Sequence, residues 1–492
     1  MDNGQSGVGE WQVAIVGAGN AGLCSGIAAL QAGVTSVAVF DAAPEELRGG
    51  NSSLTKTMRF CWQGGSFIAG LLRDADKGRV EEILGGRSGY TEEQYLDDWL
   101  RGSGCQVDVT LVNSVIRRSE STIAWMRDFG QRWAPRPKPL PGDVPIVLDG
   151  GGEGLQSRNF AQFERLGGRV FYDSAVTAID VVDGGRYALR GSGPAFPVIA
   201  DALVLASAGF EGNPEMRERH LGDQWRDVKL RGVPFNKGAP LAAAIALGAD
   251  RAGNWGKCHA TPQGIELPDY MLPGQMRQSH DLTRYAFPRG IVVNRQGRRF
   301  FDESADYSNL TYVTLGQKIL DQPGQIAFQI FDDKVIGAGV LPDGYLADPA
   351  SVLSRSIEDG ARQLGIDVEN LSHEVQRMNS GGGDFEPAER GAAVRTPKRL
   401  DTAPFLFVPV VCGLTFTYGG LSVTTNAEVR GGGEPINGLY AAGVIVGGLY
   451  DQGYPGGTGL MAGAVLGRAA GTAAAGHAIR TGGTDRVGNS AG

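Results

Sequence analysis

Cysteine is scarce, and the cofactor motifs built from it are missing. Five cysteines lie far apart in 492 residues, without a Cys-x-x-Cys pair, whereas closely spaced cysteines hold iron–sulfur clusters and c-type haem. We therefore exclude the usual patterns for both groups and predict no metal site. An odd, scattered set of thiols also favours a reducing compartment over a disulfide-bonded secreted protein, so we expect a cytoplasmic location.

Long apolar runs and an excess of positive charge are also missing. The apolar stretch over residues 13–34 is interrupted by glycines and a glutamine, so we interpret it as strand and helix instead of a membrane span. The first ten residues are polar and acidic and lack the layout of a signal peptide. A net charge of −8 argues against nucleic acid or an anionic membrane surface as a partner.

Glycine, by contrast, is abundant, with 76 residues or about twice the usual share. The most informative group follows an apolar strand, as Gly17-x-Gly19-x-x-Gly22. Gly17 permits a tight turn, Gly19 lets the backbone approach a pyrophosphate, and Gly22 lets the next helix pack closely. A second strand ends at Asp41, where a carboxylate can accept hydrogen bonds from a ribose. The pattern predicts a dinucleotide site.

The remaining chain suggests a nucleotide domain that is built from two distant segments. Helical patterns cover residues 92–100, with Thr91 as the cap, and residues 107–129. A run of small residues from 456–461 opens another helix that extends to about His477. A helix N-terminus so late in the chain could reach back to the same dinucleotide.

We predict an α/β fold of two domains, because 492 residues exceed one ordinary core. Residues 8–254 and 416–480, from both chain ends, form a Rossmann-like domain. Residues 255–415 form an inserted α+β cap domain that binds the substrate. Residues 481–492 are rich in small polar residues and are predicted to be disordered.

Several motifs, in the right order, give the chain a family resemblance. It resembles the flavoprotein subunits of fumarate reductases and succinate dehydrogenases over nearly its whole length, and it is most similar to the tricarballylate dehydrogenases. The motifs are residues 48–52, 210–213, 231–236, 258–259, 302–303, 415–420 and 452–454.

The resemblance implies FAD as the dinucleotide and a cap domain that closes over the flavin. Some family members attach FAD through a histidine just after the paired glycines, and residues 51–59 contain none, so the implied attachment is non-covalent. The residues expected to bind FAD are Gly17, Gly19, Asn20, Ala21, Gly22, Asp41, Ala42, Gly49, Gly50, Asn51, Ser52, Thr55, Ala175, Val176, Ser207, Gly209, Gly443, Gly459 and Leu460.

The implied reaction is dehydrogenation of a CH–CH bond next to a carboxylate or ketone. A hydride leaves for flavin N5 and a proton leaves the neighbouring carbon for a base, while an electrophilic group holds the activating oxygen. His259 lies at the family's substrate-binding histidine. Tyr307 and Tyr454 replace two arginines of the fumarate reductases and resemble the tyrosine placements of 3-ketosteroid dehydrogenases. Arg59 and Arg289 are candidates to bind a carboxylate or to stabilise a phenolate.

Three alternatives remain open from the sequence. The chain could reduce a C=C bond as fumarate reductases do, although three of that site's four polar groups are replaced. It could be an oxidase that passes electrons to oxygen, or a non-catalytic electron carrier, against which the large cap argues. Because no haem or cluster motif is present, a dehydrogenase would need a separate electron acceptor in addition to its small-molecule substrate.

Overall fold

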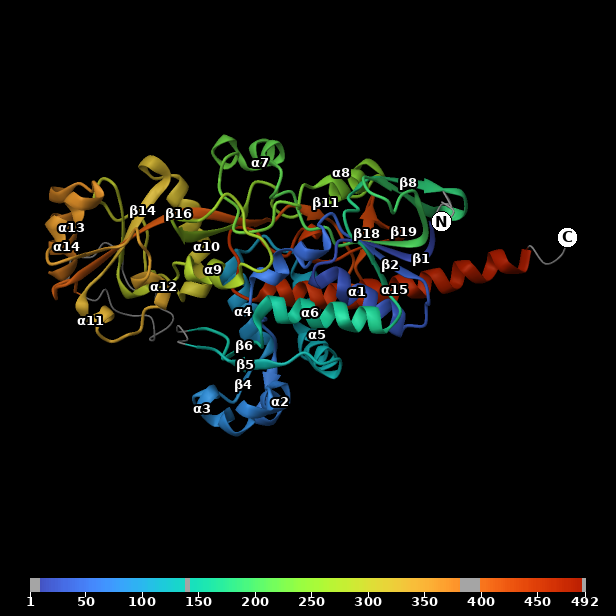
Figure 1. Ribbon diagram of the computed structural model, residues 1–492, viewed down its shortest axis with the longest axis horizontal. Coiled ribbons are helices and arrows are strands. Elements are labelled where there is room, and N and C mark those ends of the chain that lie inside the picture. The colour runs from blue at the N-terminus through green and yellow to red at the C-terminus, as the bar shows by residue number, and fades with distance from the viewer. Residues whose placement is uncertain (1–8, 138–141, 381–398, 489–492) are drawn as a thin grey trace, which may run out of the picture.

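A computed structural model describes residues 9–137, 142–380 and 399–488. Its larger sheet has the order β18-β19-β10-β1-β2-β7, in which the strands from β19 to β7 are all parallel (Figure 1). β1 and β2 are almost wholly buried where they pair, as expected for a parallel sheet covered on both faces. The strands are β1 (Gly9–Val16), β2 (Val37–Phe40), β7 (Arg169–Phe171), β10 (Val198–Leu205), β18 (Glu428–Gly431) and β19 (Glu434–Ala441).

Two helices from opposite ends of the chain pack together on this sheet. They are α1 (Asn20–Gln31) and α15 (Thr458–Gly488). Glycines in α15 permit close approach, because a Cβ at Gly467 would lie 2.4 Å from the Ala21 carbonyl oxygen and one at Gly471 would lie 1.9 Å from that of Ser25. Segments from both chain ends therefore pack together on this sheet, whereas the domain boundaries at residues 254/255 and 415/416 stay a prediction.

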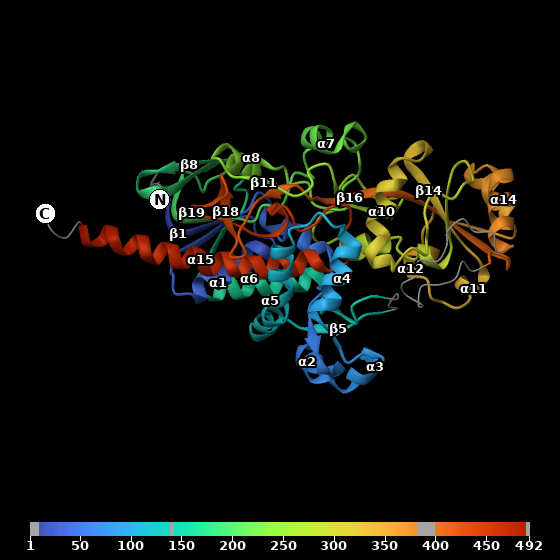
Figure 2. The ribbon, with the colours of Figure 1, turned by 180° about the vertical axis from the view of Figure 1, so that it is seen from behind.

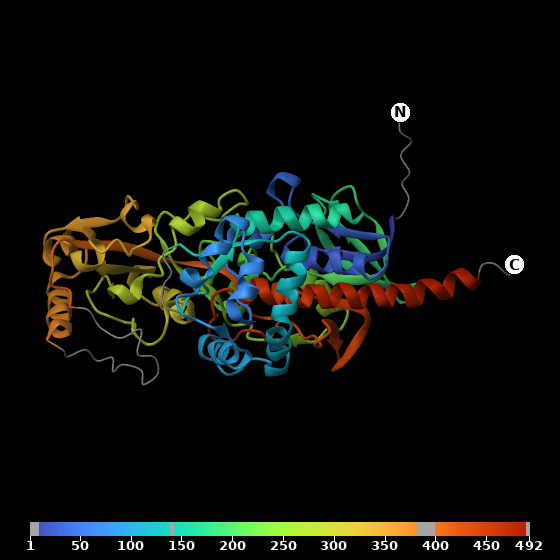
Figure 3. The same cartoon turned by 90° about the horizontal axis from the view of Figure 1, so that it is seen from below.

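The end of α15 differs from the sequence prediction. Figure 3 shows this helix running along the domain and projecting beyond it toward the C-terminus. It continues to Gly488, into the segment 481–492 that we predicted to be disordered. Residues 489–492 lie outside the described residues.

Further helices and small sheets complete the first domain. α4 begins at a capping box in which Thr91 and Gln94 exchange hydrogen bonds, which confirms the predicted cap. The elements are α4 (Glu92–Ser103), α5 (Val109–Asp128), α6 (Gly151–Arg165), α7 (Pro214–Leu221), α8 (Ala239–Ala246), β5 (Trp133–Pro135), β6 (Ile146–Leu148), β8 (Val176–Val182), β9 (Arg186–Gly191), β11 (Arg251–Ala252) and β17 (Gly420–Leu421). A lobe that projects from the body carries α2 (Gly64–Leu71), α3 (Val80–Leu84), β3 (Trp62–Gln63) and β4 (Gly89–Tyr90) (Figures 1 and 2).

A second, antiparallel sheet lies at the end of the molecule opposite both termini (Figure 2). Its longest strand, β16 (Phe405–Thr417), pairs with three neighbours and leads back to the first domain. The other strands are β12 (Cys258–Gly264), β13 (Ile291–Asn294), β14 (Ile326–Phe331) and β15 (Val352–Ser354). The surrounding helices are α9 (Met276–Asp281), α10 (Ser308–Leu320), α11 (Asp333–Ile336), α12 (Asp343–Leu346), α13 (Ile357–Leu364) and α14 (Val368–Asn379).

Candidate functional site

A cavity of about 710 Å³ lies where the two sheets meet. One part is lined by the turn before α1 and by other backbone-rich segments, and we call it the glycine cradle (residues 17–21, Asp41, 50–52, Gly443 and Leu460). Another part is lined by rings from β12, α10 and β16, and we call it the aromatic chamber (His259, Tyr285, Tyr312, Phe416 and Tyr454). The cavity therefore joins a backbone-lined cradle to a chamber lined by side chains.

The turn of the cradle requires its glycines. Gly17 has φ = +104°, and a Cβ there would lie 2.5 Å from the Ala206 carbonyl oxygen. A Cβ at Gly22 would lie 1.9 Å from the Gly17 carbonyl oxygen. The first glycine thus makes the turn and the third lets α1 pack on it, as the motif predicts.

Asp41 links this turn to the end of β2. Its Oδ2 accepts a hydrogen bond from Ala18 N at 2.6 Å, and its Oδ1 accepts one from Ala43 N at 2.8 Å. Burial raises the pKa of the carboxyl group. Asp41 lines the cavity and also fixes the shape of the turn.

The predicted flavin loop is tied to the cradle and to β16. Ser52 Oγ accepts from Asn20 N at 3.1 Å, and Asn51 Nδ2 donates to the Thr415 carbonyl oxygen at 2.9 Å. Beneath this loop, the buried Glu211 accepts from Asn236 Nδ2 at 2.8 Å. Burial raises the pKa of Glu211 to about 7.

Most residues predicted to bind the cofactor line the cavity. Three of them, Gly22, Gly49 and Gly209, do not line it. Gly49 has a positive φ of +110°, and at Gly209 a Cβ would lie only 2.1 Å from Thr417 Oγ1, so these glycines are needed for backbone conformation or close packing. Those that line it are Gly17, Gly19, Asn20, Ala21, Asp41, Ala42, Gly50, Asn51, Ser52, Thr55, Ala175, Val176, Ser207, Gly443, Gly459 and Leu460.

His259 lies at the centre of the aromatic chamber. Its Nε2 is 2.7 Å from Tyr312 Oη, and its ring stacks on Phe416 at 4.7 Å between centroids. Its buried Nδ1 has no hydrogen-bond partner among the described residues. Burial, and then the charge of Arg231, hold the pKa of His259 well below its usual range. The imidazole is therefore neutral and has one nitrogen free for a ligand.

Tyr454 meets His259 edge to face, with ring centroids 4.5 Å apart. Its hydroxyl oxygen accepts a hydrogen bond from Gly459 N at 2.7 Å, in the first turn of α15. Burial raises the pKa of the phenol, whereas this donor and the charge of Arg59 oppose the rise. A helix N-terminus and a cation both favour a phenolate, so they offset part of the cost that burial imposes on the anion, while the pKa stays above its ordinary value.

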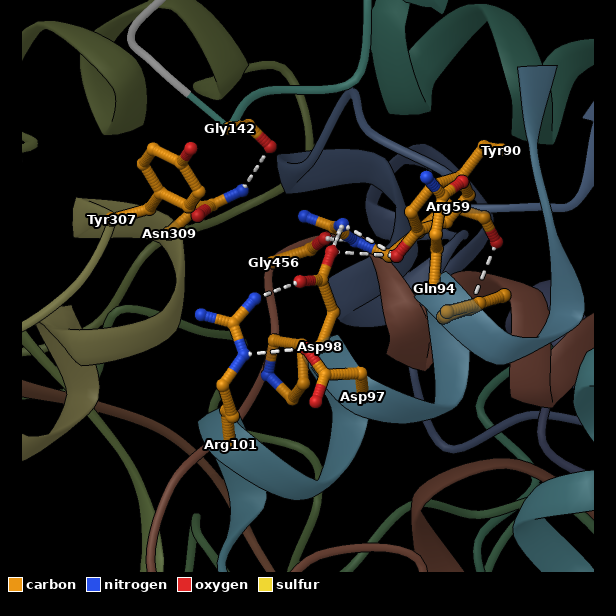
Figure 4. Close-up of polar contacts among 12 residues, drawn as sticks. Arg59, Tyr90, Gln94, Asp97, Asp98, Arg101, Gly142, Tyr307, Asn309 and Gly456 are labelled. Atoms are coloured by element: carbon orange, nitrogen blue, oxygen red, sulfur yellow. Dashed lines mark hydrogen bonds and ion pairs between the residues drawn. The ribbon is translucent and has the colours of Figure 1, made fainter. Parts of the chain in front are cut away.

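Arg59 is held tightly and keeps one nitrogen free. Its Nη1 donates to Asp98 Oδ2 at 2.8 Å and to Tyr90 Oη at 2.9 Å, and its Nε donates to the Gly456 carbonyl oxygen at 3.0 Å (Figure 4). Its Nη2 is buried and unpartnered in the part of the chain that the structure describes. Arg59 lines the cavity, and these contacts fix its guanidinium in place before a ligand arrives.

Tyr307 and Arg289 are not among the residues that line the cavity. Tyr307 precedes α10 and packs on Gly142, where an added Cβ would lie 2.6 Å from Tyr307 Cγ (Figure 4). Arg289 lies in a short 3-10 helix before β13. The structure thus brings His259, Tyr454 and Arg59 together but leaves these two candidates outside.

Other chamber residues were missed by the sequence reasoning. Tyr312, one turn into α10, lies beside His259 in the chamber, and Tyr285 packs on Tyr312 with ring centroids 4.3 Å apart. Arg231, Lys56 and His280 also line the cavity. Arg231 lies within a motif that the family resemblance used, which was a usable signal, whereas His280 had none.

The donor set of the cradle fits FAD. The N-terminus of α1 and residues 50–52 would hold the pyrophosphate and ribityl chain, and Ser207 offers a buried hydroxyl with no partner within the described ranges. Residues 12–460 match the family described as FAD binding domain. The chain belongs to this family and is an FAD-dependent oxidoreductase that acts on CH–CH groups, as the sequence predicted.

The chain is similar to several individual reductases and dehydrogenases. It is 25% identical to a probable fumarate reductase of Shewanella frigidimarina, over 95% of this chain and 75% of that protein. It is 29% identical to a 4-oxocyclohexanecarboxylate 2-dehydrogenase of Sinomonas cyclohexanicum, over 58% of this chain and 52% of that protein. A 3-ketosteroid-delta4-(5alpha)-dehydrogenase from Rhodococcus jostii has a similar fold, with a TM-score of 0.70, 22% identity, and coverage of 96% and 98%.

Two negative findings concern the described residues only. None of their helices combines the length and apolarity that crossing a membrane requires. No cluster of three His, Cys, Asp or Glu side chains there is arranged to hold a metal ion.

Proposed function

We propose that this protein desaturates a CH–CH bond next to a carboxylate or ketone, with Tyr454 as the residue that moves the proton. The observation that carries the proposal is the meeting of Tyr454, His259 and Arg59 in one chamber that opens into the cradle. Reduction of a C=C bond is the same chemistry in reverse and uses the same residues. Bound FAD supplies the two-electron acceptor or donor.

Tyr454 is the best-equipped proton acceptor of the chamber. Its oxygen receives the Gly459 N–H and lies at the start of α15, so a negative charge that develops there is stabilised. His259 is too strongly desolvated to become a cation readily, so it serves as a neutral hydrogen-bonding group. Tyr454 therefore takes the proton during desaturation and returns it during reduction.

Arg59 supplies the electrophilic contact. Asp98, Tyr90 and the Gly456 carbonyl oxygen occupy its Nη1 and Nε, which fixes the direction of the free Nη2. A donor fixed in advance stabilises the charge that develops on an activating carbonyl or carboxylate oxygen without reorganisation. Arg59 and Tyr454 thus act on neighbouring positions of one substrate.

The cofactor, its acceptor and the location complete the proposal. FAD is held non-covalently, because residues 51–59 contain no histidine, and a denatured sample should release all of its flavin into the filtrate. Electrons pass to a separate acceptor or to oxygen, and hydrogen peroxide formed during aerobic turnover would identify the oxidase alternative. Five free cysteines support a reducing, cytoplasmic environment.

An anaerobic screen of carboxylates and cyclic ketones tests the reaction, with bleaching of the flavin absorbance as the signal. Tyr454→Phe should keep the flavin spectrum and lose roughly 100- to 10,000-fold in the rate of flavin reduction, the usual contribution of a general acid or base. Tyr418→Phe is the matched control, since Tyr418 is a buried phenol of the same ring cluster, 5.8 Å from Phe416, that does not line the cavity.

The control variant should keep wild-type rates. A Tyr454→Phe enzyme that reduces its flavin as fast as the wild type would contradict the assignment of the proton to this residue. Flavin reduction that occurs at the same rate without any substrate would instead support an electron carrier.

A further inference from the structure

Three arginines line the cavity, Arg59, Arg136 and Arg231, and of these Arg231 is buried without a counter-ion among the described residues. Only 8% of this residue is exposed, and it lines the cavity. Its Nε has no hydrogen-bond partner among the described residues, and no carboxylate in those ranges forms an ion pair with it. Because an uncompensated buried charge is strongly unfavourable, this guanidinium is suited to bind an anion that enters the cavity.

The backbone around Arg231 is anchored on three sides. Arg231 N donates to the Leu414 carbonyl oxygen of β16 at 2.8 Å, and Met271 N donates to the Gly232 carbonyl oxygen at 2.9 Å. Val233 N donates to Asn51 Oδ1, from the flavin loop, at 2.8 Å. A charged side chain on such a fixed segment is positioned before any ligand arrives, which is what specific recognition requires.

The charge of Arg231 acts both on the aromatic chamber and on a second cation of the cavity lining, Lys56. After burial, this charge is the next cause that lowers the pKa of His259, and it also acts on the phenol of Tyr285. In the other direction it acts on Lys56, whose pKa is lowered by burial and then by Arg136 and Arg231. Lys56 lines the cavity and has no ion-pair partner within 4 Å among the described residues.

Carboxylates at this part of the cavity do not neutralise Arg231. Asp143 lies 3.7 Å from Arg136 Nη1, and Asp281 lies 3.7 Å from Arg277 Nε. Asp343 lines the cavity as well and has an interaction of its own. Of the other cations that line the cavity, Arg59 is paired with Asp98, Arg136 with Asp143, and Lys237 is exposed. Arg231 and Lys56 are therefore the more buried cations of the lining that have no ion-pair partner among the described residues.

We propose that Arg231, assisted by Lys56, binds a carboxylate of the substrate, in addition to the oxygen that faces Tyr454 and Arg59. The inference rests on the proposed function and narrows it: the substrate is an organic acid with two separate oxygen functions, such as an oxo acid, and not a neutral ketone. A planar guanidinium that offers parallel N–H groups matches a carboxylate in shape and charge.

The test compares an acid with its uncharged ester on the FAD-loaded enzyme. 4-Oxocyclohexanecarboxylate and its methyl ester are assayed with an artificial electron acceptor. Cyclohexanecarboxylate and its methyl ester, which lack the ketone, are titrated under non-turnover conditions while the flavin absorbance reports binding. The titration measures the subsite even if neither ketone reacts.

Two variants and one control identify the residue. Arg231→Gln should weaken binding of the acids roughly 30- to 100-fold, as expected for loss of a charge-assisted pair, and should leave ester binding unchanged. Arg231→Lys should restore part of the acid binding, because lysine keeps the positive charge but lacks the planar guanidinium with its parallel N–H groups. Arg219→Gln, an exposed arginine of α7, should behave as wild type, and the flavin content of each variant checks its folding.

The outcomes separate this inference from the proposed function. Turnover that is equal for acid and ester, or unaffected in Arg231→Gln, would overturn the subsite while the reaction stands. Arg231-dependent binding of cyclohexanecarboxylate without any flavin reduction by ketones, carboxylates or enones would keep the subsite and reject the reaction. If cyclohexanecarboxylate does not bind the wild-type enzyme, the subsite is rejected.

Discussion

The glycine cradle and the aromatic chamber differ in how far the protein itself satisfies the hydrogen bonds of their polar groups. In the cradle, Asp41 and Ser52 accept hydrogen bonds from neighbouring backbone N–H groups, so the shape is fixed by the protein itself. In the chamber and beside it, His259 Nδ1, Arg59 Nη2 and Arg231 Nε stay without partners within the described residues. The cradle is thus a prebuilt backbone surface, whereas the chamber keeps buried polar atoms for a substrate to satisfy.

The largest effect is expected from a substitution that disrupts the backbone of the cradle and leaves the chamber residues unchanged. Gly22→Val should abolish FAD binding and greatly reduce the yield of soluble protein, because a Cβ there would lie 1.9 Å from the Gly17 carbonyl oxygen. The ratio of flavin to protein and the circular dichroism spectrum measure the loss. Gly78→Ala is the control, since its Cβ would meet nothing within 4 Å. A Gly22→Val protein with full flavin content would show that the turn tolerates a side chain.

A smaller effect is expected from a residue that positions a chamber group. Asp98→Asn removes the charge that holds Arg59 Nη1, so we expect kcat/KM to fall roughly 10- to 30-fold, the cost of weakening a charged hydrogen bond, with flavin content unchanged. Asp98→Glu should recover part of the activity.

Its neighbour provides the control for this prediction. In Figure 4 Asp97 contacts Arg101, with Arg101 Nε donating to Asp97 Oδ2 at 2.9 Å, and 59% of the Asp97 side chain is exposed. Asp97→Asn should therefore leave kcat and KM unchanged. Equal losses of kcat/KM in Asp97→Asn and Asp98→Asn would mean that the effect comes from removing any negative charge from α4 and not from the position of Arg59.

A further effect concerns the support of the cradle, depends on pH, and acts on stability while leaving catalysis almost unchanged. Burial raises the pKa of Glu211 to about 7 from 4.5, so the folded state favours the protonated form. This contribution to stability is fully present below pH 4.5 and is lost as pH rises through 7, a change on the order of 3 kcal/mol.

Glu211→Gln should remove that pH dependence. The variant should match the wild type near pH 5 and be more stable at pH 8, as measured by the midpoint of urea unfolding across this range. Activity on the same substrates should change little, because Glu211 does not line the cavity. Parallel pH profiles for the two proteins would contradict the assigned titration.

Prediction from sequence succeeded where the backbone conformation of a short segment requires particular residues, because that requirement is visible in the local sequence. The turn at Gly17 and the cap at Thr91 require particular residues at fixed spacing, and the structure has both features as expected. It was less successful in the chamber. Tyr307 and Tyr312 are five positions apart on or next to α10, and only helix phase and the packing of Gly142 determine which of them faces His259.

The sequence by itself determined the class of cofactor domain, because close backbone approach to a dinucleotide can be met only by glycines in a recognisable order. Tertiary structure alone decided the chemistry around the substrate. Arg59, Arg231 and Tyr454 come from three distant segments, and only folding brings them to one cavity. Arg59 is held by Asp98, 39 residues further along the chain, and no local pattern records such a contact.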